Sequence, residues 1–198
     1  SVTISGIAEQ GQALSVSNDL IDVDGMGEIT YHWLRDGEDT GATGAGYLLT
    51  QADVGKVITV QATYTDLGGH AESVLSAATT PIANVNDLPV GSVTITGVAE
   101  QGQTLNASND LSDADGLGEI TYHWLRDNVD TGITGTSYIL TQADIGGVFT
   151  VQASYTDLGG QVESVLSAAT VPVADVNDLP VGSVTISGIA EQGQTLSV

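Results

Sequence analysis

The chain has 198 residues, with 25 acidic against 3 basic side chains, a formal net charge of -22 and no cysteine. This balance excludes nucleic-acid binding, which needs Lys and Arg against phosphate, and it disfavours direct contact with anionic membranes. Without cysteine there are no disulfides, thiolate nucleophiles or Cys-ligated zinc sites. The hydrophobic content of 41% is enough for compact cores. No apolar run is long enough to span a bilayer, and an export signal, if there is one, is expected outside this sequence.

The first ninety residues are predicted to form short strands, because apolar and polar residues alternate between turn-forming segments. An acidic, glycine-rich loop at 18–27 separates the second strand from the third, and 66–69 forms the turn of a hairpin. The glycine-rich run 41–46 is expected to be a loop, and no helix longer than one turn is expected. The predicted strands are 2–7, 13–16, 29–34, 47–49, 57–64 and 72–76. About seven β-rich segments with turns every 8–12 residues predict an antiparallel sandwich.

An internal repeat organises the chain. The sequence Ser-Val-Thr-Ile at 1–4 returns at 92–95 and at 183–186, a period of 91 residues, and roughly three quarters of the positions are identical in the two full copies. A period of this length matches one small sandwich domain. We therefore expect two domains and the start of a third, as a piece of a longer tandem array. The predicted boundaries are 1–91 with a connector at 84–91, 92–182 with a connector at 175–182, and 183–198.

Three motifs carry a resemblance to a known family. The segment 31–37, Tyr-His-Trp-Leu-Arg-Asp-Gly, resembles the C strand of immunoglobulin-like domains, with Trp33 as the inward Trp. Segment 49–55 looks like the corner before strand F, and 86–89 reads Asn-Asp-Leu-Pro. Each copy resembles the immunoglobulin-like and cadherin-like repeats of giant bacterial surface adhesins of the repeats-in-toxin type. The resemblance implies an all-β fold of tandem antiparallel sandwiches.

The acidic residues lie mostly in loops. In an immunoglobulin-like domain the B–C and F–G loops share one end and the A–B and E–F loops share the other. Stacking the two copies would therefore bring carboxylates and amide oxygens to one junction, with no Lys or Arg among them. Such a set favours a calcium ion, which takes 6–8 oxygen ligands. The predicted ligands at this junction are Glu9, Asp53, Asn84, Asn86, Asp87, Asp110, Asp113, Asp115 and Asp157.

The same junction resembles the calcium site between cadherin repeats. The connector 175–178, Asp-Val-Asn-Asp, is similar to the cadherin linker motif, and Glu9 and Glu100 match its glutamate. The first connector departs from the motif at Asn84, which implies fewer ions. Further half-sites would face absent or incomplete copies and bind weakly. They comprise Asp19, Asp22, Asp24 and Asp66 at one end, and Glu100, Asp144, Asp175, Asn177 and Asp178 at the other. A metal-free acidic surface is the alternative.

No catalytic constellation is present, so the chain is not predicted to be an enzyme. The predicted function is that of extender repeats in a bacterial surface or secreted adhesin, stiffened by Ca²⁺ at the junctions and located outside the cell. The expected partners are neighbouring repeats of the same chain, and the chain itself is expected to be monomeric. Two alternatives are an adhesive module, with homophilic or carbohydrate contacts, and a spacer attached to a secreted hydrolase.

Overall fold

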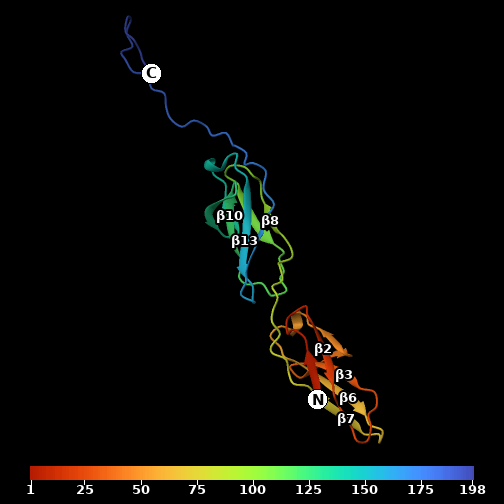
Figure 1. The fold of residues 1–198 in the computed structure, drawn as a ribbon. Coiled ribbons are helices and arrows are strands. Elements are labelled where there is room, and N and C mark those ends of the chain that lie inside the picture. Colours follow the sequence, from red (N-terminus) through yellow and green to blue (C-terminus); the bar gives the residue numbers. More distant parts are fainter. The chain divides into compact units, whose positions relative to one another are not determined.

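The computed structural model describes all residues, 1–198. The first copy forms seven strands and one short 3-10 turn, η1 (Gln51–Asp53). Its strands are β1 (Val2–Ser5), β2 (Ala13–Asn18), β3 (Thr30–Arg35), β4 (Glu38–Thr43), β5 (Gly46–Leu48), β6 (Ile58–Thr65) and β7 (Ala71–Leu75). They build a three-stranded sheet, β1-β2-β5, and a four-stranded sheet, β4-β3-β6-β7. The strand pairs are antiparallel. We call these two sheets the first sandwich (Figure 1).

The second copy repeats this plan, as expected from the sequence identity. Its elements are β8 (Val93–Thr96), β9 (Thr104–Asn109), β10 (Thr121–Arg126), β11 (Val129–Thr134), β12 (Ser137–Ile139), the 3-10 turn η2 (Gln142–Asp144), β13 (Phe149–Thr156) and β14 (Val162–Leu166). The sheet orders are β12-β9-β8 and β11-β10-β13-β14, and together they form the second sandwich. The predicted all-β class of tandem immunoglobulin-like antiparallel sandwiches is confirmed.

A buried Trp lies at the centre of each core. Trp33 is fully buried; its indole N–H donates to the Gly44 carbonyl at 3.0 Å, and its ring stacks on Tyr47 with centroids 5.5 Å apart. The core around it consists of Val2, Leu14, Leu49, Ile58, Val60, Ala62 and Ile82. These apolar residues alternate with outward polar ones along β6, so the period of two places one face of the sheet in the core. The inward orientation predicted for Trp33 is confirmed.

The run 41–46 differs from its prediction. It was expected to be a loop, but residues 41–43 continue β4, which pairs with β3 through a register shift between His32 and Leu34. Gly41, with a φ of 78°, takes the left-handed conformation within that irregular pairing. The Thr40 hydroxyl donates to the Trp33 carbonyl at 2.8 Å and holds the strand in place. The glycines thus bend an edge strand and do not end it.

By their contacts the residues divide into two compact units. The first unit comprises 1–93, 109–121 and 153–165, and the second comprises 94–108, 122–152 and 166–198. The first unit thus contains the whole first sandwich together with the loops at 109–121 and 153–165. Residues 183–198 form a small hairpin with one bridge, Ser187 to Ser197, and their side chains are exposed. The two 3-10 turns are the only helical elements, and neither is long enough to cross a membrane.

Candidate junction site

The first connector is tied to its own sandwich. Ala83 forms a parallel bridge with Glu9, and the next residue, Gln10, holds the connector with both ends of its side chain. Its amide nitrogen donates to the Asp87 Oδ2 atom at 2.8 Å, and its amide oxygen accepts from the Val85 N–H at 3.2 Å. One glutamine in the A–B turn therefore fixes the position of the connector carboxylate.

The second connector is held in the same way. Gln101 donates to Asp178 at 3.2 Å and accepts from the Val176 N–H at 3.3 Å, and Glu100 bridges to Ala174. The attachment of the connector by a glutamine side chain is thus part of the repeat. Its signal in the sequence is the Glu-Gln pair at 9–10 and 100–101, of which sequence reasoning selected only the glutamate.

Within the first unit, amide groups hold Asp115. Its Oδ2 atom accepts from the Asp87 N–H at 2.7 Å and its Oδ1 atom accepts from the Gln51 side chain at 3.0 Å. The Asp87 hydrogen bond lowers the pKa of the Asp115 carboxyl, burial opposes this, and the Asn84 and Gln51 side chains lower it further. Sequence reasoning expected neighbouring carboxylates around this side chain and missed Gln51. Both oxygens of this carboxylate therefore accept hydrogen bonds from neutral N–H donors.

Two buried side-chain oxygens in the first unit have no hydrogen-bond partner. They are Oδ2 of Asp157 and Oε1 of Gln51, and the Asp157 residue is only 4% exposed. Asn84 and Asp157 both lie close to Gly159, because a methyl group added to Gly159 would lie 3.0 Å from Asn84 Nδ2 and 3.3 Å from Asp157 Oδ1. A buried carboxylate oxygen without a partner costs free energy. These oxygens are therefore the places in the first unit where a cation or a water would stabilise the fold.

The equivalent carboxylate of the first copy does have a partner. Asp66 Oδ2 lies 3.2 Å from the His70 ring nitrogen Nδ1, while its Oδ1 accepts from the His70 N–H at 2.7 Å. These contacts with His70, the backbone bond first, lower the pKa of Asp66 although burial acts against them. In the second copy Gln161 replaces His70; its N–H still donates to Asp157 Oδ1 at 2.7 Å, but Oδ2 loses its partner.

Tyrosines hold another pair of equivalent carboxylates. The Tyr155 hydroxyl donates to Asp113 at 2.5 Å, and Tyr64 donates to Asp22 at 2.8 Å. The Asp22 hydrogen bond raises the pKa of Tyr64 to about 12, with a smaller contribution from burial. Burial and the Asp113 carboxylate raise the pKa of Tyr155 as well. One oxygen of each aspartate is thus already occupied by a neutral donor from β6 or β13.

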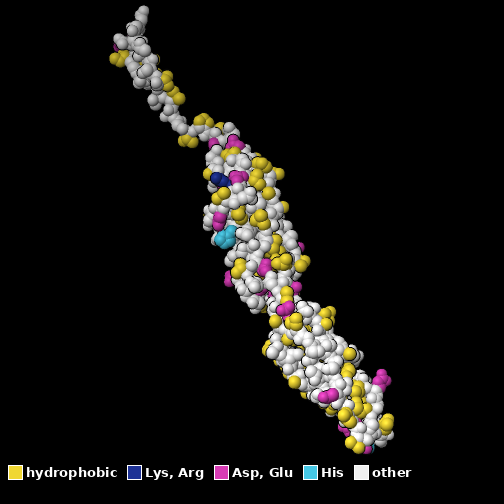
Figure 2. Space-filling view, viewed as in Figure 1, with side chains coloured by type: hydrophobic (Ala, Val, Ile, Leu, Met, Phe, Trp, Pro, Cys, Tyr) yellow, Lys and Arg dark blue, Asp and Glu magenta, His cyan; other side chains and the backbone are white.

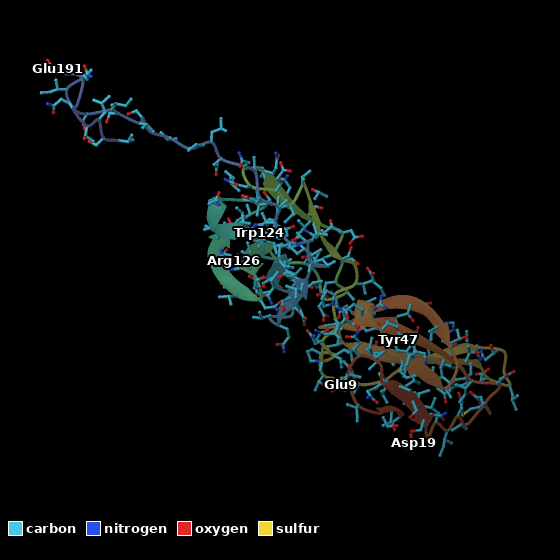
Figure 3. The ribbon with its side chains drawn as sticks, turned by 90° about the horizontal axis from the view of Figure 1, so that it is seen from above. Glu9, Asp19, Tyr47, Trp124, Arg126 and Glu191 are labelled. Carbon is cyan, nitrogen blue, oxygen red and sulfur yellow. The ribbon has the colours of Figure 1, made fainter.

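The expectation that no basic residue lies near Asp53 is wrong. Asp53 is fully buried, and Arg35 donates to it at 2.7 Å. Its other hydrogen bonds come from the Tyr47 hydroxyl at 2.9 Å and from the N–H and hydroxyl of Thr50 at 2.8 and 2.9 Å. Asp144 repeats the arrangement with Arg126. Figure 3 shows Trp124 and Arg126 on neighbouring positions of the second sandwich and Tyr47 in the first. These aspartates are the third residues of the capping boxes that begin η1 and η2, in which Thr50 and Thr141 are the N-caps.

The remaining predicted ligands are spread over separate contacts. Asn86 donates to Glu163 at 2.8 Å, and Asp110 accepts from the Ser92 N–H at 2.6 Å. No three acidic or histidine side chains come together as a group that could hold an ion. Carboxylates are visible at many places on the face drawn in Figure 2, and basic side chains at few. Glu9, Asp24, Glu100, Asp175 and Asn177 have no side-chain hydrogen bond. Calcium binding by the predicted residues stays a prediction, and any ion here would need amide oxygens as well as carboxylates.

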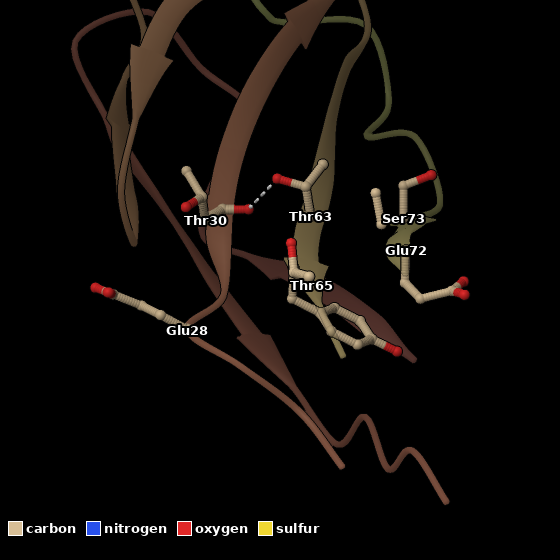
Figure 4. A pocket seen from close by; sticks show the side chains of 8 residues that line it. Glu28, Thr30, Thr63, Thr65, Glu72 and Ser73 are labelled. Atoms are coloured by element: carbon tan, nitrogen blue, oxygen red, sulfur yellow. Dashed lines mark hydrogen bonds between the residues drawn. The ribbon is translucent and has the colours of Figure 1, made fainter. Parts of the chain in front are cut away.

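A polar hollow on the first sandwich is a second candidate site. Its volume is about 460 Å³, and Figure 4 shows it between β3, β6 and β7. Its lining residues are Glu28, Thr30, Thr63, Tyr64, Thr65, Ala71, Glu72 and Ser73. The second copy has a smaller hollow of about 280 Å³, where Val162 replaces Ala71. Because the Tyr64 hydroxyl is bound to Asp22 and no buried group is aimed into the hollow, it identifies no ligand.

The pKa directions predict acid sensitivity. Burial by itself would raise the pKa of Asp53, but the hydrogen bonds from Thr50, Arg35 and Tyr47 lower it by more, so the pKa lies below its ordinary value. The pKa of Asp144 is lowered in the same way. A carboxyl whose pKa is lower in the folded state stabilises the fold above its unfolded pKa of about 3.9, and this stabilisation is lost as the pH falls towards the folded pKa. We expect the urea midpoint to fall below about pH 4. In an Asp53→Asn/Asp144→Asn variant the same midpoint should depend less on pH; an equally steep decline would contradict the assignment.

No known protein family matches the chain, and no curated protein matches it. Solved structures with some likeness are three N-terminal domains of the highly immunogenic outer capsid protein of bacteriophage RB49 and a Ca²⁺-stabilised adhesin that helps an Antarctic bacterium reach out and bind ice. The first is 20% identical with a TM-score of 0.31, over 84% of this chain and 57% of its own. The second is 15% identical with a TM-score of 0.36, over 96% and 52%.

Fibronectin(III)-like modules of Clostridium thermocellum CbhA are also similar, at 15% identity and a TM-score of 0.30, over 92% of this chain and 100% of theirs. The chain spans between half and three fifths of the length of the capsid and adhesin structures. These likenesses are too distant to indicate a function, and the assignment of the fold depends on the sheets described above.

Proposed function

We propose that the chain is a stretch of extender repeats from a bacterial surface or secreted adhesin of the repeats-in-toxin type, acting outside the cell. The observation that carries the proposal is the hydrogen-bonded path from Gln10 through Asp87 to Asp115, which ties the connector to loops of both copies. A freely hinged linker would leave these groups to water. A spacer that keeps successive repeats in a fixed arrangement needs a connector that is itself held in place.

Calcium at this junction is the finer part of the proposal. The residues that would hold it are Asp157 and Gln51, through their unpartnered buried oxygens, with Asp115 beside them. Bound Ca²⁺ would neutralise carboxylate charge in a chain whose net charge is -22. Asp53 is left out of the ligand set because it is fully buried within the first sandwich and its charge is already paired with Arg35. An ion bound only by the folded junction stabilises it by RT ln(1 + [L]/Kd), about 2.7 kcal/mol at a hundredfold excess over Kd.

Calorimetric titration with Ca²⁺ tests this site, and Asp66 offers a matched control. Asp157→Asn should abolish the binding heat, whereas Asp66→Asn should leave it unchanged, because the His70 ring already contacts the Asp66 oxygen in question. Small-angle scattering should show a narrower distribution of molecular dimensions with Ca²⁺ than with EDTA, and no such change in Asp157→Asn. Equal heats in the two variants, or no heat in the wild type, would contradict the calcium site but leave the spacer proposal standing.

An adhesive module is the second candidate function, and the hollow between β3, β6 and β7 favours it. Glu28, Glu72 and the hydroxyls beside them could donate to and accept from a sugar. The hollow presents a single tyrosine ring, and that tyrosine's hydroxyl is bound to Asp22. We therefore rank this function below the spacer.

A further inference from the structure

The second sandwich has a hollow beside β11, which we call the β11 hollow. Its volume is about 460 Å³, within the range of small-molecule sites. All of its lining residues belong to the second unit. The residues that carry the argument are Arg126, Asp127, Val129, Asp130, Tyr138 and Asp144.

A larger core residue tilts the tyrosine of this hollow. Phe149 stands where the first copy has Ile58, and the centroid of its ring lies 4.8 Å from that of Tyr138. The Tyr138 ring makes an angle of 49° with the central Trp of its sandwich, whereas the equivalent angle in the first sandwich is 18°. The Tyr138 hydroxyl donates to Asp144 at 3.2 Å and receives no hydrogen bond from arginine, so its oxygen is free to accept one.

A missing side chain changes how the arginine of this hollow is held. Gly147 stands where the first copy has Lys56, and a methyl group added to Gly147 would lie 3.0 Å from both Cγ and Cδ of Arg126. The stem of Arg126 therefore uses space that a side chain at 147 would need. Its guanidinium donates through Nη1 alone, to the Ala143 carbonyl at 2.7 Å and to Asp144 at 3.2 Å. The N–H groups of Nε and Nη2 stay free.

Free carboxylate oxygens line the same hollow. Asp127 accepts a backbone N–H through Oδ1 at 3.0 Å, but its Oδ2 has no partner within the chain. In the first copy the equivalent oxygen of Asp36 pairs with Lys56 at 3.0 Å. Asp130 Oδ2 has only a ring nitrogen of His123 nearby, at 3.6 Å. The β11 hollow thus presents unused donors and unused acceptors together.

A following repeat leaves this part of a sandwich open. The loops 109–121 and 153–165 of the second copy belong to the first unit, and from the 3-10 turn of the first copy the Gln51 side chain contacts the first of them. The equivalent of Gln51, Gln142, does not line the β11 hollow. The first-copy equivalents of four lining residues remain exposed, and they are Asp36, Glu38, Asp39 and Thr50. We therefore expect the hollow to be accessible in a longer array as well.

We propose that the β11 hollow binds a neutral sugar, a hexose unit of a glycan. A sugar hydroxyl can accept from the free N–H groups of Arg126 and donate to the free oxygens of Asp127 and Asp130, and convergent polar groups of this kind orient a ligand. An anionic ligand is disfavoured because three carboxylates and one guanidinium line the hollow. A cation would leave the guanidinium donors unpaired, and an apolar ligand would bury charged groups without partners.

NMR titration of the whole chain with methyl α-glucoside, methyl α-galactoside and methyl α-mannoside tests the proposal. At least one of them should shift the backbone amide signals of residues 127–131 and the Nε–H signal of Arg126, with a Kd of about 1 mM for a ligand of this size. Methyl glucuronide, which carries a carboxylate, should bind about tenfold more weakly or not at all.

The first copy supplies the variant that closes the hollow. Gly147→Lys/Phe149→Ile gives the second sandwich the two residues with which the first one folds. The lysine displaces the stem of Arg126 and the smaller core residue releases Tyr138, so the affinity should fall by about tenfold or more. Val162→Ala also introduces a first-copy residue, but Val162 lines the other hollow of this sandwich. That control should bind the hexoside like the wild type.

Circular dichroism should confirm that both variants are folded. The proposal is overturned if no hexoside shifts the signals of residues 127–131 at concentrations up to about 20 mM, or if the glucuronide binds as tightly as the hexosides. It is also overturned if Gly147→Lys/Phe149→Ile binds like the wild type, or if Val162→Ala weakens binding as much as that variant does. The inference depends on the second sandwich alone, so none of these outcomes bears on the spacer role or on calcium binding.

Discussion

Asp53→Ala should lower the free energy of unfolding of the first sandwich by about 3 kcal/mol, in the range seen when one partner of a buried ion pair is removed. The side chain is fully buried and accepts four hydrogen bonds, the shortest from Arg35 at 2.7 Å. Its loss leaves the Tyr47 hydroxyl and the Thr50 N–H without their acceptor. Arg35 is about a third exposed, so water recovers part of its charge interaction and keeps the loss at the lower end of that range.

The second copy supplies the matched control for this variant. Asp144 has the same set of partners, but its bonds from Arg126 and Tyr138 are both 3.2 Å, and Arg126 is more exposed than Arg35. Asp144→Ala should therefore destabilise the second sandwich by less than Asp53→Ala destabilises the first. Urea unfolding followed by fluorescence, in backgrounds that retain only Trp33 or only Trp124, reports each sandwich separately. Equal losses, or a loss below about 1 kcal/mol for Asp53→Ala, would contradict this role.

Trp33→Ala should destabilise the first sandwich by about 3–5 kcal/mol, a large part of the total stability of about 5–15 kcal/mol that a domain has. The indole is fully buried, stacks on Tyr47 and satisfies the Gly44 carbonyl. Tyr47, the ring stacked on the indole, is held by the hydrogen bond of its hydroxyl to Asp53, so a cavity is expected to remain. We expect the first sandwich to be unfolded, or to melt at a much lower temperature, in this variant.

Fluorescence makes the Trp33→Ala experiment selective, because the only remaining Trp is Trp124 in the second sandwich. The melting curve of the second sandwich, followed by Trp124 fluorescence, should stay close to that of the wild type. The calorimetric transition of the first sandwich should be shifted to lower temperature or absent. Trp124→Ala provides the reciprocal experiment. If both transitions moved together in each variant, the two sandwiches would unfold as one cooperative unit, contrary to the expectation of two domains from the repeat.

The fold was predictable from the sequence because it depends on local patterns that occur twice. Alternation along 57–64 places Val60 and Ala62 in the core whatever the rest of the chain does. The two copies independently indicate the same strands, turns and central Trp. The strand β4 was missed because glycine signals usually mark loops, and pairing with β3 overrides that preference only in the folded sheet.

The candidate site was less predictable, because a carboxylate in a sequence does not reveal its hydrogen-bond partners. Asp53 and Asp157 both precede a turn glycine in acidic, loop-rich segments, yet one is sealed inside the sandwich by Arg35 and the other has an oxygen with no partner. That difference arises from residues far away in the chain: 18 positions separate Arg35 from Asp53. Gln51, which contacts Asp115 over 64 positions, escaped notice because an amide carries no charge to draw attention.

The sequence by itself determined the repeat, the all-β sandwich class, the inward Trp and the absence of cysteine chemistry, since each depends on residue identity or on a period of two or of 91 residues. Only the tertiary structure decided which acidic side chains are neutralised within the fold and which keep an unpartnered oxygen. The physical reason is that the fate of a charge depends on its burial and on the donors within about 3 Å, and folding assembles both from segments that are distant in the chain.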